Sequence, residues 1–203
     1  MATSLILRFY NQSGAGGYCA VVQSDTGPFT GDAWLKEYAN PDGSVAFTWT
    51  TDYAFCWTDA GALVPGVQVA EEQLLPSDLQ TNNEVTLTYD TAVASFTFTN
   101  QRQGQQSGTL VIVADAGIPP GMASVGLAQS GAPVALVAAR PNMTYQFQPS
   151  GKYYLSFGKV SEQGATTTVE WGPLQALAFP AGIFSMDATL AADGTWTIQP
   201  THL

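Results

Sequence analysis

The chain has 203 residues, of which 45% are hydrophobic and only 11% are charged. This length can bury a substantial core and suits a single all-β domain, so we expect one domain over residues 1–203. Six basic residues, scattered singly, stand against sixteen acidic ones for a net charge of −10, which argues against nucleic acid and anionic membranes because both attract clustered Lys and Arg.

The N-terminal segment "MATSLILRFYN" lacks a basic region and a small-residue cleavage pattern, so we predict no Sec-type signal. No apolar run approaches the roughly 18 residues of a membrane-spanning helix. We therefore expect a soluble chain that is cytoplasmic, or released without a Sec-type signal. In the cytoplasm we expect Cys19 and Cys56 to stay reduced.

The first predicted strand leads into the glycine-rich stretch "NQSGAGGYCAVVQ", residues 11–23. A phosphate-binding loop leads into a helix, and in the P-loop a lysine follows the glycines. Here the glycines are followed by "CAVVQ", which has no lysine and has the pattern of a strand. We therefore predict that these glycines form a hairpin loop between two core strands and supply positive-φ conformations.

Helix signals are sparse. We expect one short helix over "GDAWLKEYA", residues 31–39, with Asp32 as its cap, and one interrupted turn over "EEQLLPSDLQ", residues 71–80.

Strand signals dominate the chain. Large side chains alternate in two successive runs, first Val45, Phe47 and Trp49, then Tyr53, Phe55 and Trp57. A tight turn separates the runs, so we predict a hairpin whose rings pair across strands and form the centre of the core. The same alternation recurs in residues 84–90, 94–101, 108–114, 143–149, 152–158 and 194–200.

These patterns predict an all-β fold, namely an antiparallel two-sheet β-sandwich of jelly-roll or Greek-key type with one or two short helices. A closed barrel is the alternative.

The sequence offers no recognisable catalytic, cofactor-binding or metal-binding residues. Its only histidine is the penultimate His202, which argues against Ser-His-Asp and His-based zinc chemistry. The triplets "DTG" at 25–27 and "DTA" at 90–92 are similar to those of aspartic proteases, but their flanking residues favour turns. No pattern marks a pair among the sixteen carboxylates, which leaves a carboxylate-based hydrolase open.

Four residues in less regular segments are candidates for ligand binding: Trp34, Tyr38, Trp171 and Asp32. Exposed rings stack on sugar faces and nearby carboxylates accept hydrogen bonds from hydroxyls, so this set suits a carbohydrate-binding, lectin-like module. For each ring alone, an ordinary place in the core or at its rim is the better explanation.

Three stretches together resemble the RhiA family of bacterial proteins: "FYNQSGAGGYCAVVQ" (9–23), "AWLKEYANPDGSVAFTWTTDYAFCWTDAGALVPGV" (33–67) and "ASVGLAQSGAPVALVAARPNMTYQFQPSGKYYLSFG" (123–158). The resemblance implies a small, soluble protein, expressed in response to population density or host surroundings, without an assigned activity. It transfers no catalytic or ligand-binding residue to this chain.

A surface poor in charge and strands rich in aromatic residues favour a non-enzymatic protein that acts by self-association or surface recognition. Its expected partner is itself, in a homo-oligomer or a higher assembly. Carbohydrate binding is the alternative function, and a carboxylate-based hydrolase the third.

Overall fold

The structure, a computed structural model, describes residues 2–23, 34–59, 73–149, 151–163 and 166–201. These residues form seventeen strands and contain no helix, which confirms the all-β prediction. None of the described segments is a helix long and apolar enough to cross a membrane.

The two predicted helices are wrong where the structure describes them. Residues Leu35–Ala39 form strand β3, and Gln73–Ser77 form strand β6. Each pairs with a neighbouring strand, β3 with Gly17–Val22 (β2) and β6 with Tyr53–Thr58 (β5). Ladder hydrogen bonds to a neighbouring strand override a weak local helix propensity.

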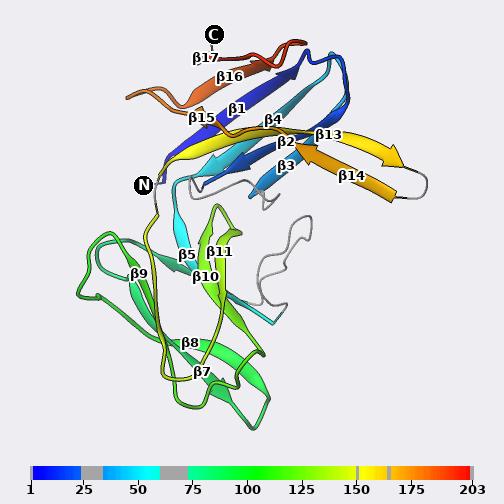
Figure 1. The fold of residues 1–203 in the computed structure, drawn as a ribbon. Helices are drawn as coiled ribbons and strands as arrows, with labels where there is room; N and C mark the ends of the chain where they lie inside the picture. Colours follow the sequence, from blue (N-terminus) through cyan, green and yellow to red (C-terminus); the bar gives the residue numbers. More distant parts are fainter. Residues whose placement is uncertain (1, 24–33, 60–72, 150, 164–165, 202–203) are drawn as a thin grey trace. The chain divides into compact units, whose positions relative to one another are not determined.

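The strands belong to four sheets in two compact units (Figure 1). Unit 1 comprises Met1–Thr50 and Ser150–Leu203, and unit 2 comprises Thr51–Pro149. The prediction of one domain over residues 1–203 concerns the two units together, and it stays a prediction.

Unit 1 contains two sheets. The first has the order β17-β16-β1-β4, with β1 at Ser4–Asn11, β4 at Ser44–Thr50, β16 at Ser185–Leu190 and β17 at Trp196–Pro200. The second has the order β14-β13-β2-β3, with β13 at Tyr153–Gln163 and β14 at Thr166–Trp171, while β15 (Gln175–Leu177) pairs with β13.

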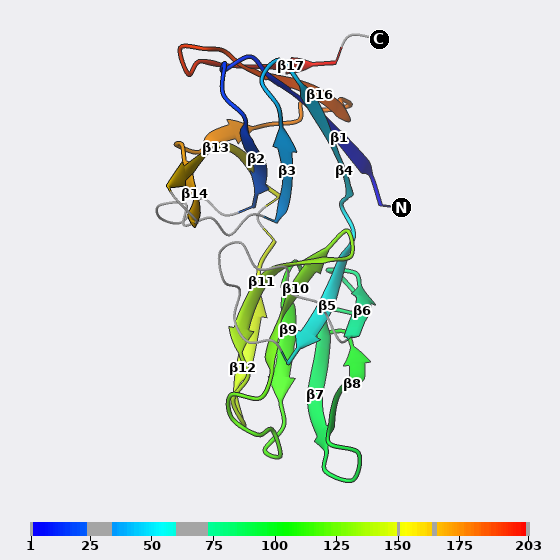
Figure 2. The same cartoon turned by 90° about the vertical axis from the view of Figure 1, so that its right-hand side faces the viewer.

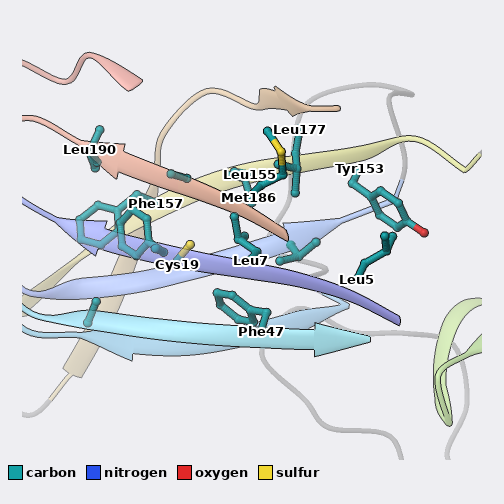
Figure 3. Packing of buried hydrophobic residues seen from close by; sticks show 14 of the residues in the cluster. Leu5, Leu7, Cys19, Phe47, Tyr153, Leu155, Phe157, Leu177, Met186 and Leu190 are labelled. Carbon is teal, nitrogen blue, oxygen red and sulfur yellow. The ribbon is translucent and has the colours of Figure 1, made fainter. Parts of the chain in front are cut away.

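Both sheets of unit 1 supply side chains to one buried cluster (Figure 3). Leu7 and Phe9 of β1 meet Cys19 of β2 and Leu155 of β13, all with 0% of their surface exposed. Burial alternates along β1 and β4, so each of these strands contributes one face to the cluster.

Unit 2 also contains two sheets (Figure 2). One has the order β11-β10-β5-β6, with β10 at Ser124–Gln129 and β11 at Ala132–Ala138. The other has the order β12-β9-β7-β8, with β7 at Glu84–Asp90, β8 at Ser95–Arg102, β9 at Leu110–Ala114 and β12 at Thr144–Phe147. A second buried cluster takes residues from both sheets, among them Phe55, Leu87, Ile112 and Val125.

The prediction that residues 45–57 form a hairpin is wrong, because the two strands do not pair with each other. The prediction that their large side chains are buried is confirmed for Phe47, Trp49, Phe55 and Trp57. Strand β4 pairs with β1 and strand β5 with β10 and β6, in different units. Phe47 and Trp49 are buried in the unit 1 cluster, whereas Phe55 and Trp57 are buried in the unit 2 cluster. Local alternation indicates which face is buried, but it does not indicate the partner strand.

The sheets are not purely antiparallel as predicted. Strand β1 pairs in parallel with β16, and β7 pairs in parallel with β9. A parallel pair requires a long crossover, and such a connection leaves no local trace in a sequence pattern.

Candidate functional site

Strand register brings two of the four predicted ligand-binding residues into one line across a sheet of unit 1. Trp171 of β14 lies opposite Gly158 of β13, Gly158 lies opposite Tyr18 of β2, and Tyr18 lies opposite Tyr38 of β3. Residues opposite each other in paired strands point to the same face. We call this set of Trp171, Gly158, Tyr18 and Tyr38 the aromatic row.

The aromatic row lies on the face of its sheet that points away from the buried cluster. Cys19 and Phe157, the sequence neighbours of Tyr18 and Gly158, belong to that cluster. Successive side chains in a strand point to opposite faces, so the row faces outward. Tyr38 is 44% exposed, and the rings of Tyr18 and Trp171 are partly exposed.

Burial varies along this outer face. Ser156 and Ala20 follow the row on the same face, opposite each other, and both are 0% exposed. Lys36 lies opposite Ala20 in β3 and is exposed. The rings of the row and Lys36 are therefore accessible, whereas Ser156 and Ala20 are covered.

Two glycines let the outer rings lie against the backbone. A Cβ atom on Gly158 would come within 2.8 Å of Cε3 of Trp171, and one on Gly16 within 2.3 Å of the hydroxyl oxygen of Tyr38. Both distances are shorter than real Cβ contacts, so any side chain at these positions would displace a ring.

These contacts explain part of the glycine-rich stretch. Strands β1 and β2 lie in different sheets, so the predicted hairpin loop between them is wrong. Gly14 has a φ of +77°, as expected for a turn glycine. Gly16 and Gly17 instead allow close approach, since a Cβ on Gly17 would lie 2.4 Å from the carbonyl oxygen of Gly158.

Aromatic and cationic groups contact each other in the row. The rings of Tyr18 and Tyr38 lie 5.3 Å apart at 76°, an edge-to-face arrangement. Nζ of Lys36 lies 5.3 Å from the centre of the Tyr18 ring, within the range of a cation–π contact. The row thus presents three rings and two phenol hydroxyls, and the neighbouring Lys36 adds one ammonium group. None of these residues carries a carboxylate.

Trp34 is not part of the row. Its ring packs against the unit 1 cluster, edge-on to Trp49 at 5.7 Å and stacked on Tyr153 at 6.2 Å. Its indole Nε1 is buried and has no hydrogen-bond partner among the residues that the structure describes. Asp32, the fourth candidate, lies outside the described residues.

Sequence reasoning missed Tyr18, Gly158 and Lys36. Alternation with Cys19 would place Tyr18 on an outer face, but only the register shows that Trp171, more than 150 positions further along the chain, shares its line. Register is set by long-range pairing and not by local pattern.

The structure places several of the groups that sequence analysis considered for catalysis. Burial raises the pKa of the Cys19 thiol far above its ordinary value, so the nucleophilic thiolate is disfavoured. Asp90 accepts a hydrogen bond from the backbone N–H of Ala92 at 2.8 Å, which confirms the turn interpretation of that triplet. In the described ranges no three His, Cys, Asp or Glu side chains lie close enough to hold a metal ion.

Comparison with known proteins identifies the family. The sequence profile of the RhiA family matches residues 2–201. The chain is 27% identical over 157 residues to Protein RhiA of Rhizobium leguminosarum bv. viciae, and this alignment covers 77% of the chain and 67% of the relative. No solved structure matches the chain significantly. The chain belongs to the RhiA family.

Proposed function

We propose that this protein acts by non-covalent recognition and not by catalysis, and that the aromatic row binds the face of a carbohydrate chain. The observation that carries the proposal is the register that lines up Trp171, Tyr18 and Tyr38 on one outward face. The C–H face of a sugar ring is apolar and packs on aromatic faces, while its hydroxyls accept and donate hydrogen bonds at the edges.

The dimensions of the row favour an oligosaccharide over a single sugar. From Trp171 to Tyr38 the row crosses three strand spacings, or about 14 Å. A ligand that contacts both ends must therefore extend over several sugar rings and run across the strands.

The polar groups beside the rings suit hydroxyl-rich ligands. Lys36 donates through its ammonium group, and the hydroxyls of Tyr18 and Tyr38 both donate and accept. Lys36 is the single charged side chain among these groups, which suits a neutral ligand.

We further infer that each unit is a β-sandwich of jelly-roll or Greek-key type. Support comes from the two clusters, each of which takes side chains from both sheets of its unit. In unit 1 the sheet of β17, β16, β1 and β4 would pack beneath β2, β13 and β14 and hold them rigid under the rings, and a rigid platform loses less entropy on binding.

A binding assay against a panel of neutral and acidic polysaccharides tests the proposal. We expect the unmodified protein to bind at least one of them, and Trp171→Ala and Tyr38→Ala each to weaken that binding by about tenfold or more. Phe184→Ala is the matched control, because Phe184 is 52% exposed in unit 1 but lies outside the row.

Two results would contradict carbohydrate binding at the row. One is that the protein binds none of the polysaccharides. The other is that Phe184→Ala weakens binding as much as the two row variants do. Trp34→Ala is a poor probe of the site, because Trp34 packs against Trp49 and Tyr153 and its loss would destabilise unit 1.

A further inference from the structure

We propose that the outer edge of strand β11 in unit 2 pairs with β11 of a second copy of this chain, antiparallel and centred on Val137. The inference does not depend on carbohydrate binding, because it concerns a different unit.

Strand β11 is an apolar strand at the edge of its sheet. Within the described residues it pairs only with β10. Its seven residues, "APVALVA", include no polar or charged side chain, yet each is at least partly exposed, Val137 to 39%. An exposed edge of this composition is a template for pairing with another strand.

Three other edge strands of the described part carry features that oppose such pairing. Strand β6 contains Pro76, β3 carries Lys36 and Glu37, and β8 ends at Arg102 in an ion pair with Glu84. Proline lacks the N–H donor and charges resist burial at a strand interface. In β11 the proline stands second, which leaves residues 134–138 without a block.

The alternation of hydrogen-bonded and non-bonded residue pairs between β10 and β11 determines which backbone groups of β11 point outward. The N–H of Ala139 donates to the carbonyl of Ala123 at 2.8 Å. Bonded pairs alternate along an antiparallel ladder, so Val137 is bonded to β10, whereas the N–H and C=O groups of Leu136 and Ala138 point away from it.

These outward groups fit a second copy about a two-fold axis. With Val137 opposite Val137, Leu136 of each copy lies opposite Ala138 of the other. Leu136 and Ala138 each offer one N–H donor and one C=O acceptor to the other copy. The Ala138 carbonyl already accepts a hydrogen bond from the Tyr145 hydroxyl at 3.1 Å, so its bond to the second copy would use the other lone pair. The pairing is isologous and closes as a dimer.

Local charge also favours a second copy. The chain carries a net charge of −10, but residues 116–149 contain no acidic residue and only one basic residue, Arg140. Pairing through β11 therefore brings together the part of unit 2 where repulsion between two acidic chains is weakest.

Sedimentation velocity over about a hundredfold range of concentration tests the dimer. We expect the unmodified protein to dimerise and Val137→Lys, which places two ammonium groups opposite each other, to weaken dimerisation by at least about tenfold. Thr48→Lys adds the same charge to the exposed side of edge strand β4 in unit 1 and should leave dimerisation unchanged. A monomer throughout, or equal effects of the two substitutions, would overturn the proposal.

Cross-linking tests the register separately. Opposed residues of a non-bonded antiparallel pair have Cα atoms about 4.5 Å apart, close enough for a disulfide. We expect Val137→Cys to give a disulfide-linked dimer on mild oxidation, without competition from Cys19 and Cys56, which are 0% exposed. Thr48→Cys is the control, and cross-linking no faster than in that control would overturn the register.

Discussion

Cys19 is a thiol that its surroundings keep protonated. It lies in the unit 1 cluster with none of its surface exposed, and burial raises its pKa. Cys56 is equally buried in unit 2, and neither residue forms a disulfide. Both thiols are therefore expected to be inert in the folded protein.

Alkylation followed by mass spectrometry checks this expectation. We expect no label on Cys19 or Cys56 under native conditions and complete labelling of both in denaturant. Fast labelling before unfolding, or a Cys19–Cys56 disulfide, would contradict it.

Asp78 shows the opposite shift at an exposed turn. Its carboxylate accepts hydrogen bonds from the backbone N–H groups of Gln80 and Thr81 and from the Thr81 hydroxyl, and these bonds lower its pKa to about 2. A lowered pKa stabilises the folded state above the ordinary value of 3.8, and this contribution disappears as the pH falls towards 2.

We expect Asp78→Ala to lower the free energy of unfolding at neutral pH, with the difference from the unmodified protein shrinking as the pH falls below 3.8. Denaturant titrations at several pH values measure it. Asp78→Asn keeps an oxygen acceptor for the two amides and should recover part of the loss. A difference that stays constant down to pH 2 would show that the hydrogen bonds do not act through the charge.

At the scale of elements, the close approach of β14 to β13 depends on Gly158. A Cβ atom there would lie 2.4 Å from Cγ1 of Val169 and 2.8 Å from Cε3 of Trp171. We expect Gly158→Ala to destabilise the protein by about 1–3 kcal/mol as an overpacked site does, and to lift the Trp171 ring into solvent.

Denaturant unfolding and tryptophan emission measure the two effects of Gly158→Ala. Gly117→Ala is the control, because a Cβ atom there would have nothing within 4 Å. An unchanged emission spectrum together with unchanged stability would mean that the ring does not rest on the glycine.

Strands were predictable where burial alternates along one face. Residues 84–90 form β7 as predicted, and the run at 94–101 corresponds to β8. Leu35–Ala39 was not predictable, because "LKEYA" has residues common in helices and becomes a strand only through its ladder with β2. A local sequence pattern does not indicate which strand, tens of residues away, will be the partner.

The candidate site was predictable in part for the same reason. Tyr38 and Trp171 stood out as aromatic residues in less regular segments, but their common line depends on the register of three strand pairs. Trp34 stood out in the same way, and its contacts with Trp49 and Tyr153 place it in the cluster instead.

At the scale of the whole molecule, two clusters divide the core between two units. Trp49 is 1% exposed in unit 1 and Phe55 is 0% exposed in unit 2. Replacing either by Ala should cost about 3–5 kcal/mol, because each leaves a large cavity.

Hydrogen exchange distinguishes the two variants. We expect Trp49→Ala to reduce the protection of backbone amides chiefly in unit 1, and Phe55→Ala chiefly in unit 2. Equal losses in both units from either variant would contradict this division and indicate a single cooperative body.

The parallel pair of β1 and β16 has a consequence for synthesis on the ribosome. Residues 6–11 of β1 pair with residues 185–190, which the ribosome adds more than 170 residues later. A nascent chain that has reached Pro149 already contains all eight strands of unit 2, but only β1 to β4 of unit 1. Until β13 and β16 emerge, β2 and β1 each lack one of their partner strands, so this unit has unpaired strand edges during synthesis and needs a chaperone more than unit 2 does.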